Sequence, residues 1–188
     1  MVGASIAATA CFTVGTSFQA PKVSEAQLGR MTDRELLSSL GPDAGRPSSV
    51  TRRGVRMDCY EFDSYKAGFS AVGKGLAGRS AEYCFAKGVL VGYIVTSNLS
   101  EDSTDFDLGK ARTIARGMTR AQVIGLLGNP AGAAIAPIAE LDGGIQLRYS
   151  YTGYHGTLTM QKDVLKDAFI ELDSTGTVLT SRIDEQLR

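Results

Sequence analysis

Two cysteines, Cys59 and Cys84, lie where a disulfide could join two strands. Both fall in segments with a strand pattern that we expect to pair as antiparallel neighbours, so their side chains can meet across the ladder. In an oxidising compartment the sulfurs would bond and close a loop of about 25 residues, which stabilises a fold by about 3 kcal/mol. Two buried, reduced thiols are the alternative. Thiol catalysis is not expected, because neither a Cys-x-x-Cys motif nor a nearby histidine is present.

His155 is the only histidine of the chain. A catalytic triad or a Cys–His pair would have no other base of this type, and a metal site built on several histidines is excluded. We interpret His155 as an ordinary loop residue. The carboxylates near turns and edges are too scattered to indicate an acid–base pair: Glu140, Asp142, Asp163, Asp167 and Asp173. We therefore expect no catalytic residue, no metal site and no enzymatic activity.

The glycine-rich segment 68–75 ends in Gly73-Lys74-Gly75, which looks at first like a phosphate-binding loop. A nucleotide loop of that type needs Ser or Thr directly after the lysine, because that hydroxyl ligates magnesium. Gly75 occupies the position instead. We predict an excursion between two strands, and no nucleotide or other cofactor.

Charge and hydropathy exclude further classes. The 188 residues include 20 basic and 20 acidic ones, and the sequence pI is near 6.6. Without an excess of positive charge, nucleic acid is not expected as a partner. No apolar run approaches the roughly 18 residues of a membrane-spanning helix.

The first eleven residues carry no charge and end in Ala8-Thr9-Ala10-Cys11. This segment resembles the lipobox of bacterial lipoproteins, in which a lipid is attached to the cysteine after the chain is cut in front of it. The resemblance implies export, with lipidation at Cys11. No Lys or Arg precedes Lys22, so the positive region of a signal peptide would have to come from an upstream start. An Ala-rich terminus with an incidental cysteine is the alternative.

An internal repeat organises the rest of the chain. The Met-Thr pair at residues 31–32 returns at 118–119, an offset of 87 residues. Each threonine is followed three residues later by Glu35 or Gln122, which predicts a capping box at the start of a helix. Gly41 and Gly128, each followed closely by proline, predict helices of only about two turns. Shorter helices are expected before them, over residues 22–28 and 109–116.

Alternating strand patterns follow each predicted helix pair. We expect one three-stranded antiparallel meander at residues 55–63, 82–86 and 89–96, and a second at 145–151, 168–172 and 177–183. The predicted fold class is therefore α+β, with two tandem modules at 15–98 and 103–188, each with two short helices packed on a three-stranded meander.

The motifs resemble the SmpA/OmlA family of outer membrane lipoproteins, also called BamE-like. The resemblance rests on a Gly-Met-Thr cap, a Leu-Gly-x-Pro helix end, an aromatic strand and a closing turn: Gly117-Met118-Thr119, Leu126-Leu127-Gly128-Asn129-Pro130, Tyr149, Tyr151 and Gly176-Thr177-Val178-Leu179. Arg30 stands where the first copy would need its glycine. A typical member has one copy of the module, and a tandem is similar to β-lactamase inhibitory proteins.

The resemblance implies a lipid anchor at the periplasmic face of the outer membrane and a role in β-barrel protein assembly. We therefore expect a non-catalytic envelope lipoprotein that acts through protein–protein contacts. A periplasmic or secreted inhibitor of an enzyme is the alternative. Recognition residues often lie on loops at one rim of a scaffold, so the interface candidates are Tyr65, Phe69, Tyr154 and His155.

Overall fold

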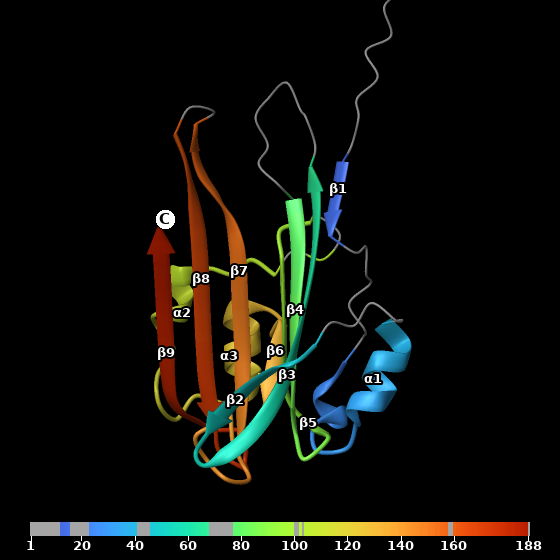
Figure 1. Ribbon diagram of the computed structural model, residues 1–188. Helices are drawn as coiled ribbons and strands as arrows, with labels where there is room; N and C mark the ends of the chain where they lie inside the picture. The colour runs from blue at the N-terminus through green and yellow to red at the C-terminus, as the bar shows by residue number, and fades with distance from the viewer. Residues whose placement is uncertain are drawn as a thin grey trace, which may run out of the picture.

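The computed structural model describes residues 12–15, 23–40, 46–67, 77–99, 102, 104–157 and 160–187. They form one antiparallel sheet of nine strands with short helices on one face (Figure 1). The strands are β1 (Phe12–Gly15), β2 (Ser48–Arg52), β3 (Val55–Ala67), β4 (Ala77–Ala86), β5 (Val89–Ser97), β6 (Gly132–Ala134), β7 (Ile145–Thr157), β8 (Met160–Leu172) and β9 (Val178–Leu187). The helical segments are the 3-10 turn η1 (Glu25–Gln27), α1 (Asp33–Leu40), α2 (Leu108–Ala111) and α3 (Arg120–Leu127).

The short strand β6 makes the sheet continuous. The order is β1-β3-β4-β5-β6-β7-β8-β9, and β2 also pairs with β3. β6 lies between β5 and β7 and pairs with both, so that Ala133 faces Tyr93 on one side and Leu147 on the other. A Cβ atom added to Gly132 would lie 2.1 Å from the carbonyl oxygen of Tyr93, so only glycine permits this approach. β6 thereby covers two edges that would otherwise be open.

The predicted fold of two α+β modules, each with two short helices on a three-stranded meander, is wrong. The described residues form a single, mainly β structure, in which β1 and β2 extend one side of the sheet and β6 fills its centre. The helices have at most 8 residues, whereas β3, β7 and β8 have 13 each. The prediction missed β6 because a three-residue segment of Gly and Ala carries no strand periodicity.

Both eight-residue helices begin with a capping box. The backbone amide of Thr32 donates to the Glu35 carboxylate at 2.8 Å, and that of Thr119 donates to Gln122 Oε1 at 2.8 Å. The two threonine hydroxyls accept the return bonds, each at 3.3 Å. The threonines also form isolated β-bridges, to Val89 and Thr177 respectively. Each helix start is therefore fastened to the sheet.

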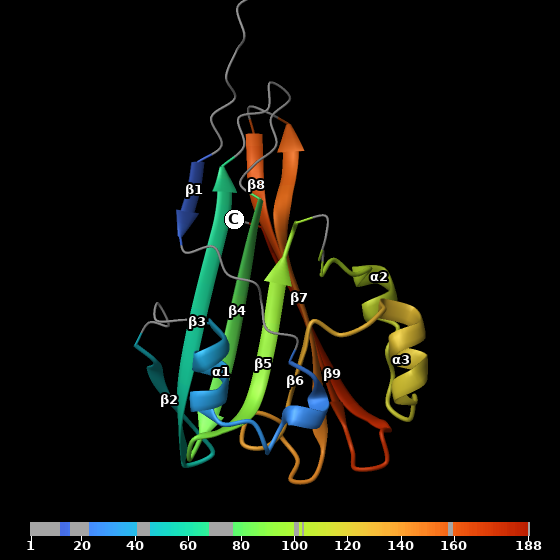
Figure 2. The same cartoon turned by 90° about the vertical axis from the view of Figure 1, so that its right-hand side faces the viewer.

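The core lies between the helices and one face of the sheet, which Figure 2 shows turned toward the viewer. Under α1, Leu36 packs with Tyr83 and Phe85, and under α3, Val123 packs with Leu147 in a second cluster. The strand residues of both clusters lie on the same side of the sheet. The register places one row of this side across seven strands: Tyr60, Tyr83, Tyr93, Ala133, Leu147, Ile170 and Ser181. Each large apolar side chain buried there contributes about 1.5–3 kcal/mol.

An ion pair connects the two helical regions. Both terminal nitrogens of the Arg120 guanidinium, at the start of α3, donate to the carboxylate of Glu25 in η1. This hydrogen bond is the main reason that the pKa of Arg120 is raised. Among the described residues, no helix has the length and apolar character needed to cross a bilayer.

Candidate functional site

The face of the sheet away from the helices carries an ordered row of charged and aromatic side chains. Because neighbours in register point to the same side, one row crosses seven strands on this face: Glu61, Glu82, Ile94, Gly132, Arg148, Phe169 and Arg182. The row alternates with the buried row under the helices. We call this side the open face, and we call Arg148, Phe169 and Arg182 the Arg–Phe–Arg array.

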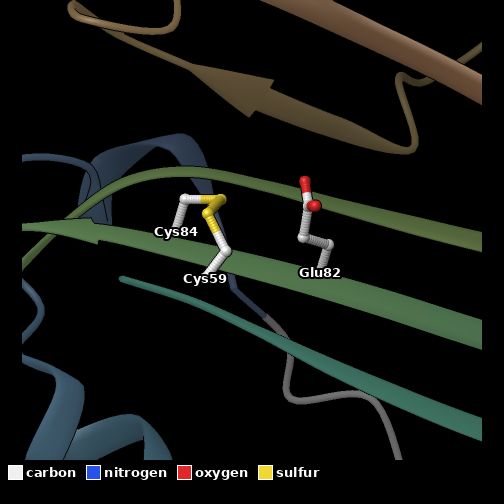
Figure 3. Close-up of side chains that lie close together, drawn as sticks. All are labelled: Cys59, Glu82 and Cys84. Carbon is white, nitrogen blue, oxygen red and sulfur yellow. A yellow bond between two sulfur atoms is a disulfide. The ribbon is translucent and has the colours of Figure 1, made fainter. Parts of the chain in front are cut away.

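The next row on the open face contains the disulfide. Cys59 and Cys84 are direct cross-strand partners with Cα atoms 4.0 Å apart, and their sulfurs are bonded (Figure 3). Both are buried with Met57, Val91 and Ile138. Ile138 belongs to the segment after β6, which therefore covers this part of the open face.

The sulfurs of Cys59 and Cys84 and a carboxylate oxygen of Glu82 lie within 4.8 Å of one another. Figure 3 shows all three side chains on the same side of the sheet. Cysteine binds metals as a thiolate, and the disulfide leaves no thiolate to either residue. In the bonded form this cluster therefore offers one carboxylate and no metal site.

Arg148 is buried in the open face, and part of its guanidinium makes no hydrogen bond to a described residue. Its side chain is only 13% exposed, and its Nη1 lies 3.7 Å from Glu82 Oε1, which is beyond hydrogen-bond distance. Within the part of the chain that the structure describes, Nε and Nη1 have no hydrogen-bond partner. Burial lowers the pKa of Arg148, and the charge of Glu82 acts in the opposite direction. The guanidinium is thus held in a place that costs free energy.

Phe169 lies between two guanidinium groups. The Cζ atom of Arg148 is 5.6 Å from the centre of the Phe169 ring, and that of Arg182 is 4.6 Å from it. Both distances are within cation–π range. Arg182 is itself paired with Asp184 at 3.1 Å. The array therefore presents an aromatic ring bracketed by positive charge.

A polar pair is buried beside the array. Gln146 Nε2 donates to Glu171 Oε1 at 2.6 Å, and the backbone amide of Glu140 donates to the other oxygen at 3.3 Å. Glu171 is 4% exposed, and burial raises its pKa above the ordinary value of 4.5. The same row of the sheet that holds the disulfide holds this pair, because Ala134 joins Gln146 to Gly92 and Cys84 through the register.

The interface residues predicted from the sequence lie elsewhere. Tyr65 is in β3 opposite Gly78, and Tyr154 and His155 are in β7 opposite Asp163 and Lys162. These segments of β3 and β7 lie at the same end of the sheet (Figures 1 and 2). The other candidates, Cys11 and Phe69, are outside the described residues, as is the glycine-rich segment 68–75. The interface role of Tyr65, Phe69, Tyr154 and His155 and the lipidation of Cys11 stay predictions.

Sequence reasoning missed the Arg–Phe–Arg array. The alternation in the predicted strand 145–151 places Arg148 on the side opposite Leu147 and Tyr149, and Phe169 likewise stands between Ala168 and Ile170. The sequence alternation alone therefore could have predicted that Arg148 and Phe169 lie on the outward side of neighbouring strands. Their contact required the register, which shows that they face each other.

Comparisons with known proteins find a likeness in structure without a match in sequence family. No protein-family model matches the chain, and no curated protein matches it significantly. A crystal structure at 1.40 Å resolution, of a protein described as a "putative beta-lactamase inhibitor protein" from Streptococcus mutans, is similar with a TM-score of 0.42 and 11% sequence identity. The likeness covers 81% of this chain and 82% of that chain. A similarity of this degree assigns no function.

Proposed function

We propose that this chain is a non-catalytic binding protein that docks a protein partner on the open face of its sheet, around Phe169. The observation that carries the proposal is the Arg–Phe–Arg array: a partly buried aromatic ring with a guanidinium on either side, at 5.6 and 4.6 Å. Arginine and aromatic residues are the side chains that most often dominate the binding energy of protein interfaces.

The position of the array on three paired strands supports the same proposal. Arg148, Phe169 and Arg182 lie on β7, β8 and β9, whose backbones are fixed by continuous pairing. A rigid anchor loses little conformational entropy on binding. Arg148 is buried with two nitrogen atoms that make no hydrogen bond among the described residues and with a long ion pair to Glu82, which has no evident benefit for stability. A binding role gives this residue a reason to be retained.

We propose in addition that the chain is exported and anchored through a lipid on Cys11, at the periplasmic face of the outer membrane. The lipobox-like sequence Ala8-Thr9-Ala10-Cys11 supports this. Metabolic labelling with a fatty acid tests it: we expect labelling of the wild type and none of Cys11→Ala. An unlabelled, soluble chain would favour the periplasmic or secreted alternative.

A pull-down with the tagged, full-length protein tests the docking proposal. We expect a partner to be recovered by the wild type and by Arg34→Ala, an exposed control on α1, and at least about tenfold less of it by Phe169→Ala. Recovery of β-barrel assembly components would place the protein at that machinery, whereas recovery of one enzyme would favour the inhibitor alternative. Equal recovery by all three variants would contradict docking on the open face.

A further inference from the structure

A cavity of about 350 Å³ lies where two hairpin turns meet the segment after β6. The turns are those of β2–β3 and β4–β5, which lie together at the lower end of the sheet in Figures 1 and 2. Cationic, acidic and apolar residues share its lining: Arg53, Val55, Ala86, Lys87, Ala136, Pro137 and Asp142. Cavities that hold small organic ligands start at about 300 Å³.

The two cations of this cavity have an unusual backbone conformation. Arg53 has φ 50° and Lys87 has φ 53°, and they are the non-glycine residues with positive φ in the described part of the chain. Each is followed by a glycine, Gly54 at φ 75° and Gly88 at φ 76°, as in two-residue hairpin turns. Asn, Asp or Gly is the usual first residue of such a turn, because the left-handed region costs other side chains about 1–2 kcal/mol. Turn formation therefore does not explain the two cations.

The charges leave one cation available at the cavity. Arg53 Nη1 donates to the Ala139 carbonyl at 3.3 Å and pairs with Asp142 at 3.2 Å. The Lys87 ammonium group makes no hydrogen bond and no ion pair within the described residues. Arg53 and Lys87 against Asp142 give the lining a net charge of +1, as 2 − 1. The uncharged residues of the lining are all apolar: Val55, Ala86, Ala136 and Pro137.

We propose that this cavity binds a small organic carboxylate. The carboxylate pairs with the Lys87 ammonium beside the fixed Arg53 guanidinium, and the apolar part of the ligand packs against Ala136 and Pro137. Charge complementarity selects an anion, and the apolar walls select one with an organic body over a hydrated inorganic ion. The proposal does not depend on docking at the open face, since the cavity and the Arg–Phe–Arg array share no residue.

Titration of the full-length, ¹⁵N-labelled protein with benzoate tests the proposal by amide chemical shifts. Benzamide is the matched neutral probe. We expect benzoate to shift the amides of Arg53, Lys87 and their glycines, and benzamide to leave them in place. Lys87→Asn should weaken benzoate binding by about tenfold or more, because a hydrogen bond to a charged group is lost. Lys110→Gln, on the exposed side of α2, should bind as the wild type does.

The Lys87→Asn substitution separates binding from folding. Asparagine tolerates the left-handed conformation better than lysine, so its thermal midpoint should be equal to or above that of the wild type while binding falls. Lys87→Gly serves the same purpose if the asparagine variant folds poorly. The proposal is overturned by benzoate that shifts no amide at the cavity, by benzamide that acts as benzoate does, or by a folded Lys87 variant with unchanged affinity.

Discussion

The two halves of the sheet fasten their helices in the same way and differ in the chemistry of their open face. In each half a glycine amide and a strand amide make matching bonds around the Met-Thr pair: Gly29 to Leu90 at 2.8 Å and Leu90 to Met31 at 2.8 Å, then Gly117 to Val178 at 2.9 Å and Val178 to Met118 at 2.8 Å. On the open face, β3 and β4 are joined by a disulfide, whereas β7, β8 and β9 carry the Arg–Phe–Arg array.

This difference separates stability from recognition. A disulfide stabilises through the unfolded chain and presents no group to a partner, and Ile138 packs with it. The array of the second half costs desolvation free energy and offers an aromatic ring and two cations. We therefore predict that stability depends on the first half and docking of a protein partner on the second.

The largest expected effect is on the disulfide. Replacing both cysteines, Cys59→Ala with Cys84→Ala, should lower the free energy of unfolding by about 3 kcal/mol, because the 25-residue separation no longer restricts the unfolded chain. Urea denaturation measures the change, with Cys11→Ala as the control that leaves it unaffected. A loss below about 1 kcal/mol would show that the first half does not depend on this bond.

The capping boxes should contribute equally in both halves. Thr32→Ala and Thr119→Ala should each cost about 1 kcal/mol at neutral pH, because each removes a hydroxyl that accepts a helix-start amide. Thermal or urea unfolding of the two variants measures it. Unequal costs would mean that the matching geometry is not matched in energy.

Acid should separate these two variants. Hydrogen bonds from Thr32 lower the pKa of Glu35 below 4.5, so its contribution is present above that value and is lost as pH falls through the lowered pKa. Gln122 does not titrate. The cost of Thr32→Ala should therefore shrink in acid while that of Thr119→Ala stays constant, as unfolding curves at several pH values would show. Parallel pH profiles would contradict the role of the Glu35 carboxylate.

Arg148→Met should change stability little. The substitution removes a buried charge whose Nε and Nη1 lack hydrogen-bond partners among the described residues. It also breaks the long ion pair to Glu82, whose side chain is 42% exposed and can be solvated. We expect the free energy of unfolding to stay within about 1 kcal/mol of the wild type or to rise. The same variant should lose the partner in the pull-down. A strongly destabilised protein would assign Arg148 to stability and weaken the comparison.

Glu171→Gln should give the smallest effect, visible in the pH profile alone. Burial raises the pKa of Glu171 in the folded protein, so its contribution to stability is present below 4.5 and is lost as pH rises through the raised pKa. The glutamine variant lacks this loss. Its stability relative to the wild type should therefore increase between acid and neutral pH, which denaturation at both values measures. An unchanged difference would show that Glu171 titrates normally.

Local features of the chain were predictable, and their assembly was not. The capping boxes at Thr32 and Thr119 depend on residues three positions apart, and the pairing of Cys59 with Cys84 follows from two neighbouring strands. The joining of the halves depends on β6. The need for glycine at position 132 becomes evident only from its close approach to the backbone of Tyr93. The Arg–Phe–Arg array similarly depends on register. The sequence pattern therefore could not predict contacts between residues that are distant in the sequence.

If Cys11 carries a lipid, the position of β1 determines how the sheet meets the membrane. β1 starts at Phe12, directly after Cys11, and Phe12 faces Ala67 at the far end of β3. Consecutive Cα atoms are about 3.8 Å apart, so a lipid on Cys11 would leave no flexible linker between the bilayer and the sheet. On the lipoprotein proposal, the protein would stand upright on the membrane, with one end of the sheet at the membrane surface. The ends of β3 and β7 would then face the lipid, and the β4–β5 turn at the opposite end of the sheet, which lines the cavity, would face the periplasm (Figure 1).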